Sequence, residues 1–122
     1  MEHFFITGTS RGIGKALALR VLQETKTMVN GAARNAGINH ERYKHFYLNL
    51  SQTDALISKL DDFFPHLTQA DRLVLINNAG TLGPVQYTGQ QDPVEIASAF
   101  QINVIAPAIL TNHFIKKYQT YA

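Results

Sequence analysis

Three glycines spaced to hold a phosphate group follow the first apolar segment of the chain. Residues 7–14 read T-G-T-S-R-G-I-G, with an apolar run before them and a helical pattern after them. Glycines at positions 8, 12 and 14 let the backbone turn sharply and approach a ligand closely, because they carry no Cβ. The free N–H groups and positive dipole end of the following helix favour an anion such as a pyrophosphate. The Ser10 hydroxyl adds a donor and Arg11 a positive charge.

The spacing G-x-x-x-G-x-G differs from the G-x-G-x-x-G of the common dinucleotide fingerprint. A glycine-rich turn can also be a plain connection between a strand and a helix, without any ligand. The apolar run before the turn and the amphipathic pattern after it favour the phosphate-binding interpretation.

A second charged position follows the next apolar run, which ends at Arg34. No Asp or Glu occurs between Thr25 and His40, whereas NAD-selective Rossmann domains place a carboxylate at the end of their second strand. A guanidinium binds a 2′-phosphate that a carboxylate would repel. Arg34, together with Arg11, therefore predicts NADP(H) as the cofactor. The alternative is that Arg34 is an ordinary solvated residue at a strand end.

The elements that position these residues alternate between two hydrophobic patterns. Strand-like runs cover residues 3–7, 27–33, 45–50 and 72–76, and residues 35–44 form a polar connection with at most a short helix. Helical patterns cover residues 12–24, residues 52–64, and residue 93 almost to the C-terminus. Ser51 is the expected N-cap of the second helix. Asp92 is the expected N-cap of the third helix, with Pro93 at its first position. Pro107 is expected to kink or divide this last helix.

This alternation predicts an α/β fold, a doubly wound parallel sheet of the Rossmann type. The strand order expected for one domain of residues 1–122 is 3-2-1-4.

Composition excludes several classes of function. Eleven Lys and Arg against nine Asp and Glu leave a net charge of +2, and the basic residues are scattered, unlike those of a nucleic-acid binder. There is no cysteine, and the five histidines lack metal-ligand spacing, so no metal site is expected. The longest nearly unbroken apolar run, residues 104–110, is too short to span a membrane. Without a signal-like N-terminus, the expected location is the cytoplasm.

The residues T-G-x-x-x-G-I-G at the first turn and N-N-A-G at 77–80 resemble the short-chain dehydrogenase/reductase family. Asn49-Leu50 matches the family's Asp-Leu/Val at the adenine pocket, with Asn in place of the usual Asp. Asn78, Ala79 and Gly80 then lie along the cofactor, although a plain Asn-rich turn is an alternative. The resemblance and the residues together give a set of candidate cofactor-binding positions: Gly8, Ser10, Arg11, Gly12, Ile13, Gly14, Arg34, Asn49, Leu50, Asn78, Ala79 and Gly80.

Asn103 is the candidate catalytic residue, because it sits in an otherwise apolar helical stretch where a buried amide needs partners. In the family an Asn at this position belongs to a catalytic tetrad and supports a proton relay to the lysine. An amide that caps the break before Pro107 is a structural alternative, compatible with that role.

The rest of the family's tetrad is a serine, a tyrosine and a lysine four residues after the tyrosine. None of the five tyrosines has a lysine at that spacing. The chain is therefore expected to be the N-terminal, cofactor-binding half of a longer enzyme, truncated before the catalytic region and inactive alone.

Within the family, the run after the fourth strand is similar to that of the sepiapterin reductase and benzil reductase group, which implies a small carbonyl or alcohol substrate. An open strand edge at 73–76 and an excess of apolar residues in the last helix predict self-association or a homo-oligomer. Two alternatives remain open: a dinucleotide-binding module without catalysis, and an interaction fragment that completes its sheet with another chain.

Overall fold

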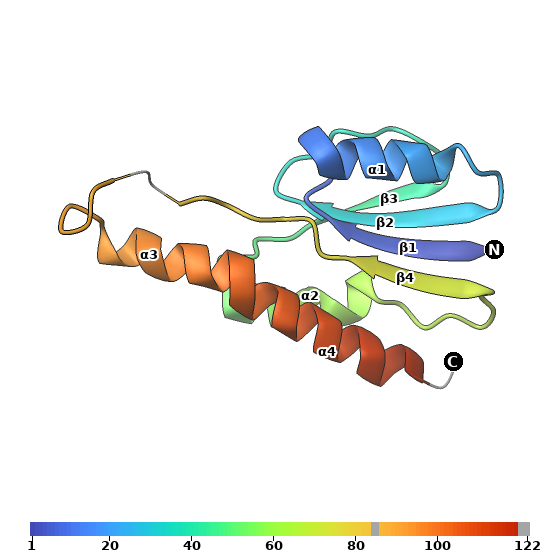
Figure 1. Cartoon of the computed structure of the whole chain (residues 1–122). Coiled ribbons are helices and arrows are strands. Elements are labelled where there is room, and N and C mark those ends of the chain that lie inside the picture. The colour runs from blue at the N-terminus through green and yellow to red at the C-terminus, as the bar shows by residue number, and fades with distance from the viewer. Residues whose placement is uncertain (84–85, 120–122) are drawn as a thin grey trace.

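The computed structural model describes residues 1–83 and 86–119, and within them it contains a parallel sheet of four strands. The strands are β1 (Glu2–Thr7), β2 (Thr27–Ala33), β3 (Tyr43–Tyr47) and β4 (Arg72–Ile76). Their order, β3-β2-β1-β4, confirms the predicted Rossmann-type topology. All the strands point the same way, so their carboxyl ends meet at one edge of the sheet (Figure 1).

Helices cover both faces of this sheet. Helix α1 (Gly12–Leu22) lies on one face, and α2 (Thr53–Phe63) and α4 (Ala106–Tyr118) lie on the other (Figure 1). Because successive strand residues point to opposite faces, Ile6 packs beneath α1 with Ala18 and Leu22, whereas Phe5 packs toward α2 and α4. The two cores hold the central strands from both sides and so fix the edge at which the strands end.

Strand β3 begins and ends earlier than the predicted run of residues 45–50. It pairs with β2 from Val29 opposite Tyr43 to Ala33 opposite Tyr47, and it ends where its partner ends. Leu48 then turns into the core on the α2 side. The pairing partner, not the local apolar run, sets the bounds of this edge strand.

The predicted N-cap at Ser51 is wrong. Helix α2 begins at Thr53 after Gln52, which has the N-cap position without a side-chain cap. The Ser51 backbone N–H and hydroxyl both donate to Asn49 Oδ1, at 3.1 and 2.5 Å. Ser51 therefore closes a turn after β3 instead of capping the helix.

The C-terminal helix begins as predicted. Helix α3 (Pro93–Phe100) has Pro93 in its first turn, and Asp92 Oδ1 accepts a hydrogen bond from the Val94 N–H at 2.9 Å.

Pro107 does not divide this helix. A π-helical turn, η1 (Gln101–Ile105), links α3 to α4, and the Ala106 N–H donates five residues back to the Gln101 carbonyl. Proline cannot donate to the Asn103 carbonyl, and its ring would crowd that oxygen in a regular α-helix, so the wider turn before it accommodates the residue.

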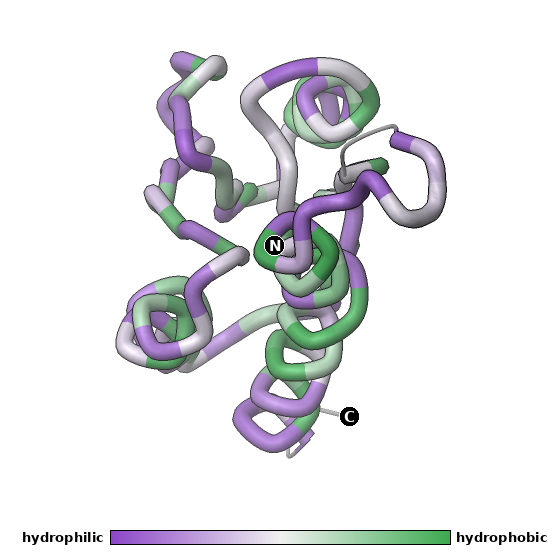
Figure 2. Tube along the Cα trace, turned by 90° about the vertical axis from the view of Figure 1, so that its left-hand side faces the viewer, coloured by the Kyte–Doolittle hydropathy of each residue, from purple (hydrophilic) through white to green (hydrophobic). Residues whose placement is uncertain are grey.

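The continuous helical run Pro93–Tyr118 is long and apolar enough, by length and composition alone, to cross a membrane. The sequence predicts no membrane span, since residues 104–110 are the longest apolar run. The helix, however, continues through Pro107 and so contains the apolar residues on both sides of it. Figure 2 shows these hydrophobic positions recurring along the run. Ala106 and Leu110 are buried in the core beside the sheet, whereas only 11% of the most apolar window of the run is buried.

Candidate functional site

The glycine turn between β1 and α1 has the backbone conformation that its glycines predict. Gly8 and Gly12 have φ angles of +77° and +62°, in the left-handed region that favours glycine. Arg11 occupies the N-cap of α1, but its side chain makes no cap hydrogen bond. The first N–H groups of α1 therefore remain available to an anion placed in the turn.

Gly14 serves packing and is not among the residues that line the cleft described below. A Cβ at this position would lie 2.0 Å from the Gly8 carbonyl oxygen and 2.4 Å from Asn78 Nδ2. Only glycine lets α1 approach the end of β1 and the loop after β4 this closely. Ile13, another predicted cofactor residue, has an exposed side chain and does not line the cleft described below.

Thr7 joins the end of β1 to the segment after β4, a role that the sequence patterns do not predict. Its buried Oγ1 accepts hydrogen bonds from the backbone N–H groups of Asn78 and Ala79, at 3.1 and 3.0 Å. Asn78 Nδ2 in turn donates to the Gly8 carbonyl at 3.4 Å. These bonds hold the glycine turn and the N-N-A-G segment as one unit.

A cleft of about 790 Å³ opens at the carboxyl ends of the strands, a size and place typical of cofactor sites in α/β sheets. The structure brings together around it most of the predicted cofactor residues: Gly8, Ser10, Arg11, Gly12, Arg34, Asn49, Leu50, Asn78, Ala79 and Gly80. The cleft is also lined by residues for which the sequence predicts no contact with a cofactor: Ala32, Ala33, Asn35, Ala36, Leu48, Ser51, Thr81, Ser98 and Ile102.

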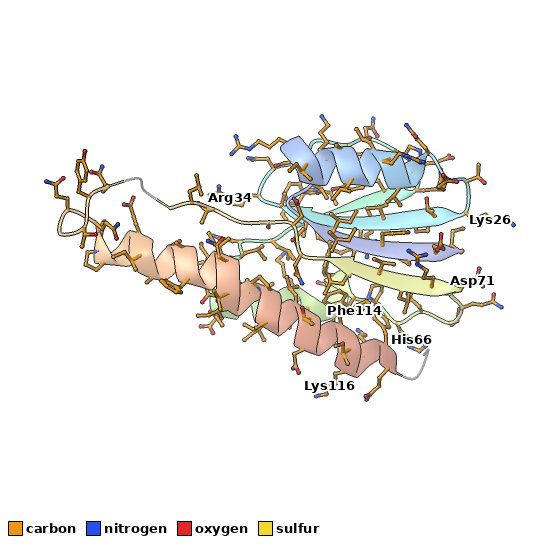
Figure 3. The ribbon with its side chains drawn as sticks, in the orientation of Figure 1. Lys26, Arg34, His66, Asp71, Phe114 and Lys116 are labelled. Carbon is orange, nitrogen blue, oxygen red and sulfur yellow. The ribbon has the colours of Figure 1, made fainter. Side chains whose placement is uncertain are left out.

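The charged side chains that line this cleft are both arginines. Arg11 and Arg34 are exposed, and the lining, taken over the described residues, includes no carboxylate. Figure 3 shows Arg34 near the carboxyl ends of the strands, with Lys26 at the opposite edge of the sheet. The cleft is therefore electrostatically suited to an anionic ligand.

Asn49 lies at the predicted adenine pocket, but part of its hydrogen-bonding capacity is already used within the protein. Its Oδ1 already accepts from the backbone and hydroxyl of Ser51. Its Nδ2 is the atom left to face the cleft, and an amide nitrogen only donates. The replacement of the family's Asp by Asn thus changes an acceptor into a donor at this place.

Asn103 lies in the π-helical turn and holds the segment after the N-N-A-G motif. Its Oδ1 accepts from the Thr81 N–H at 2.8 Å, and its Nδ2 donates to the Thr81 carbonyl at 2.6 Å. The side chain is exposed, and it does not cap the break before Pro107, so both the expected burial and the structural alternative are wrong. Thr81 lines the cleft, and Asn103 acts on the cleft through it.

A hydrogen-bonded chain of side chains also reaches the glycine turn from β3. Tyr43 Oη lies 2.7 Å from Thr9 Oγ1 and 2.8 Å from His45 Nδ1, and His45 Nε2 lies 3.3 Å from the Ala33 carbonyl oxygen. Burial lowers the pKa of His45 and raises the pKa of Tyr43, so both rings favour their neutral forms. The sequence offered no signal for these contacts, because they join residues of different elements.

The chain matches a family model described as short chain dehydrogenase over residues 2–120. Among curated proteins, it is 27% identical to benzil reductase ((S)-benzoin forming) of Bacillus subtilis, covering 100% of this chain and 51% of the relative. It is 28% identical to sepiapterin reductase of Xenopus laevis, covering 93% of this chain and 49% of the relative. The chain therefore spans about half the length of these relatives. The predicted likeness to both reductases is confirmed.

Solved structures of similar fold agree with this result. A short-chain dehydrogenase/reductase from Burkholderia vietnamiensis superposes with a TM-score of 0.84 at 29% identity, covering 95% of this chain and 58% of that one. A metagenomic short-chain oxidoreductase in complex with NADP superposes with a TM-score of 0.80 at 25% identity, covering 98% of this chain and 57% of that one.

Proposed function

Because this chain belongs to the short-chain dehydrogenase family, we propose that it is the NADP(H)-binding half of an oxidoreductase of a small carbonyl or alcohol. One observation carries the cofactor assignment: the cleft is lined by Arg11 and Arg34, and its described lining has no carboxylate. A 2′-phosphate needs such an environment, whereas a bare ribose diol is recognised by an acid. The similar metagenomic oxidoreductase was solved in complex with NADP.

In this proposal the pyrophosphate lies in the glycine turn and the 2′-phosphate lies between the two arginines. The N–H groups at the start of α1 and the Ser10 hydroxyl bind the pyrophosphate, and Asn49 and Leu50 border the adenine. Asn78, Ala79 and Gly80 border the nicotinamide end. Asn103 orders Thr81 beside them through its two backbone hydrogen bonds and supports the family's proton relay.

When bound in the complete enzyme, NADPH would supply the hydride for reduction of a carbonyl group. Proton delivery in the family needs a tyrosine followed by a lysine at the fourth position, and the sequence contains no such pair. We therefore propose that this chain binds the cofactor without turnover. A non-catalytic dinucleotide-binding protein would behave in the same way, and an interaction fragment would bind neither cofactor. The proposed location is the cytoplasm.

Titration with NADPH and NADH tests the cofactor assignment. We expect NADPH to bind at least about tenfold more tightly, because charge-assisted hydrogen bonds to the extra phosphate are made only by that ligand. Arg34→Gln should remove most of the difference. Lys26→Gln is the matched control, since Lys26 is an exposed cation directly before β2 and Arg34 directly follows it. Equal affinities of the unaltered chain for the two cofactors would overturn the proposal.

A further inference from the structure

A line of hydrogen bonds runs from the glycine turn across β2 to the residue before Arg34. It passes from Thr9 Oγ1 to Tyr43 Oη, then to His45 Nδ1, and from His45 Nε2 to the Ala33 carbonyl oxygen. Its two ends lie beside the two parts of the cleft that carry Arg11 and Arg34.

The direction of each hydrogen bond follows from the acceptor at its end. A carbonyl oxygen only accepts, so His45 Nε2 carries the hydrogen that faces Ala33. In the neutral ring Nδ1 is then an acceptor, and the Tyr43 hydroxyl must donate to it. Tyr43 Oη consequently accepts from the hydroxyl of Thr9, a residue that is 0% exposed. Every hydrogen in the line is used, so breaking one bond leaves a partly buried polar group without its partner.

The line exists because β2 has no side chain where Tyr43 crosses it. His45 is the register partner of Gly31, and a Cβ on Gly31 would lie 2.1 Å from Tyr43 Oη. The missing side chain lets the aromatic residues of the edge strand lean over β2 toward the glycine turn.

A second contact ties the segment after Arg34 to the same turn. A Cβ on Gly37 would lie 2.4 Å from the Ser10 carbonyl oxygen. The chain is therefore linked to the glycine turn through the hydrogen bond at Ala33 before Arg34, and its backbone approaches the same turn closely at Gly37 after Arg34.

We propose that Tyr43 and His45 are positioning residues that set the distance between the glycine turn and Arg34, and thereby the preference for a cofactor with a 2′-phosphate. This inference rests on the proposed NADP(H) function. The affinity for a ligand that binds to both the glycine turn and the Arg34 guanidinium depends on the distance between these two groups. A ligand without the 2′-phosphate engages the turn but not that guanidinium, and it tolerates a shift between them.

The test is the ratio of the NADPH and NADH dissociation constants in Tyr43→Phe, which keeps the ring and removes the hydroxyl. We expect the NADPH dissociation constant to rise about tenfold, from the loss of a partly buried hydrogen bond, and that of NADH to change less than about threefold. His45→Asn keeps an acceptor near Tyr43 but removes the hydrogen bond to Ala33. It should likewise lower the preference for NADPH over NADH. The double variant should be no worse than the more affected single variant, because both act through one line of bonds.

Tyr47→Phe is the matched control, because Tyr47 lies on the same face of β3 and packs against the His45 ring, but its side chain is exposed. It should leave the preference unchanged. An equal weakening of both cofactors, or no change in Tyr43→Phe and His45→Asn, would overturn the inference. Loss of NADPH preference in the unaltered chain would instead contradict the proposed function, so the two failures are distinguishable.

Discussion

His3 is a buried imidazole in the first strand, and a short line of polar contacts surrounds it. Its Nε2 lies 3.1 Å from Asn30 Oδ1, and Asn30 Nδ2 donates to the Phe63 carbonyl at 2.9 Å, near the end of α2. The ring stacks on Phe5 with centroids 4.6 Å apart. These contacts join β1, β2 and α2 through side chains that a sequence pattern would place in an apolar core.

Burial lowers the pKa of His3, against a smaller opposite effect of the hydrogen bond to Asn30. The unfolded chain therefore takes up a proton on this ring at a higher pH than the folded protein does. The contribution of this ring to stability should be full above the ordinary histidine pKa of 6.5 and should be lost as the pH falls below that value. Urea unfolding at several pH values measures this slope.

His3→Gln keeps a donor toward Asn30 but does not titrate, so its stability should depend less steeply on pH. Its stability at about pH 8 should be lower, because the ring that stacks on Phe5 is lost. His66→Gln, at an exposed position, should retain the slope of the unaltered chain. A His3→Gln variant with that same slope would show that another group dominates.

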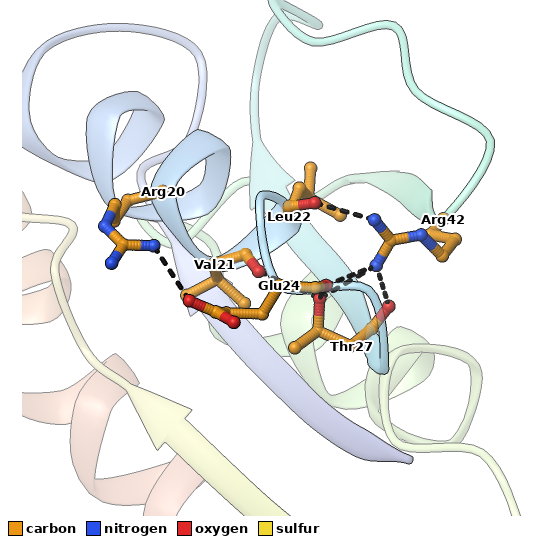
Figure 4. A network of polar contacts seen from close by, with 6 residues as sticks. All are labelled: Arg20, Val21, Leu22, Glu24, Thr27 and Arg42. Carbon is orange, nitrogen blue, oxygen red and sulfur yellow. Dashed lines mark hydrogen bonds and ion pairs between the residues drawn. The ribbon is translucent and has the colours of Figure 1, made fainter.

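At the scale of elements, Arg42 closes the end of α1 from outside the helix. Its Nη2 donates to the Leu22 carbonyl at 2.6 Å, and its Nη1 donates to the Glu24 and Thr27 carbonyls at 2.9 and 2.7 Å. Figure 4 shows this fork beside the exposed pair of Arg20 and Glu24. The guanidinium thus satisfies the Leu22 carbonyl, which α1 leaves free at its C-terminus, and joins it to the carbonyls of Glu24 and Thr27 in the connection to β2.

Arg42→Lys should lower the free energy of unfolding by about 1–2 kcal/mol, because a single ammonium cannot reproduce the fork. The matched control is Arg20→Lys, which alters an exposed ion pair worth less than about 1 kcal/mol. Chemical denaturation of both variants measures the difference. Similar losses in the two variants would contradict a specific role of Arg42.

At the scale of the whole molecule, the C-terminal helical run has an apolar outer surface. Val94, Phe100, Val104 and Ile115 are exposed on it. Strand β4 lies at the edge of the described sheet, and a groove of about 380 Å³ beside it is lined in part by Leu73 and Phe114. Such surfaces mark sites of association.

We expect the purified chain to self-associate through this helical surface, with an apparent mass that rises with concentration in analytical ultracentrifugation. Phe100→Glu should shift the equilibrium toward the monomer by about tenfold or more, because it places a charge in the apolar patch. Ile57→Glu, a comparably exposed position on α2, should not. A monomer at all concentrations, with one cooperative melting transition, would rule out self-association.

Features that depend on neighbouring residues could be predicted from the sequence alone. The glycine turn, the apolar strands β2 and β4, and the Asp92 cap with Pro93 are confirmed where the patterns placed them. Each is decided by local sterics, by hydrophobic periodicity, or by a hydrogen bond within one turn. The strand order also followed, because the alternation of strands and helices indicates the doubly wound class, in which the first four strands have the order 3-2-1-4.

Features that depend on residues far apart in the chain required the tertiary structure. The bounds of β3 follow its pairing with β2, and the Asn103 amide is used by the Thr81 backbone instead of an apolar core. The line from Thr9 through Tyr43 to His45 exists only because Gly31 leaves the surface of β2 open where Tyr43 crosses it. Strand register, cavities and side-chain hydrogen bonds depend on which surfaces come into contact in the fold, and local sequence patterns do not determine those contacts.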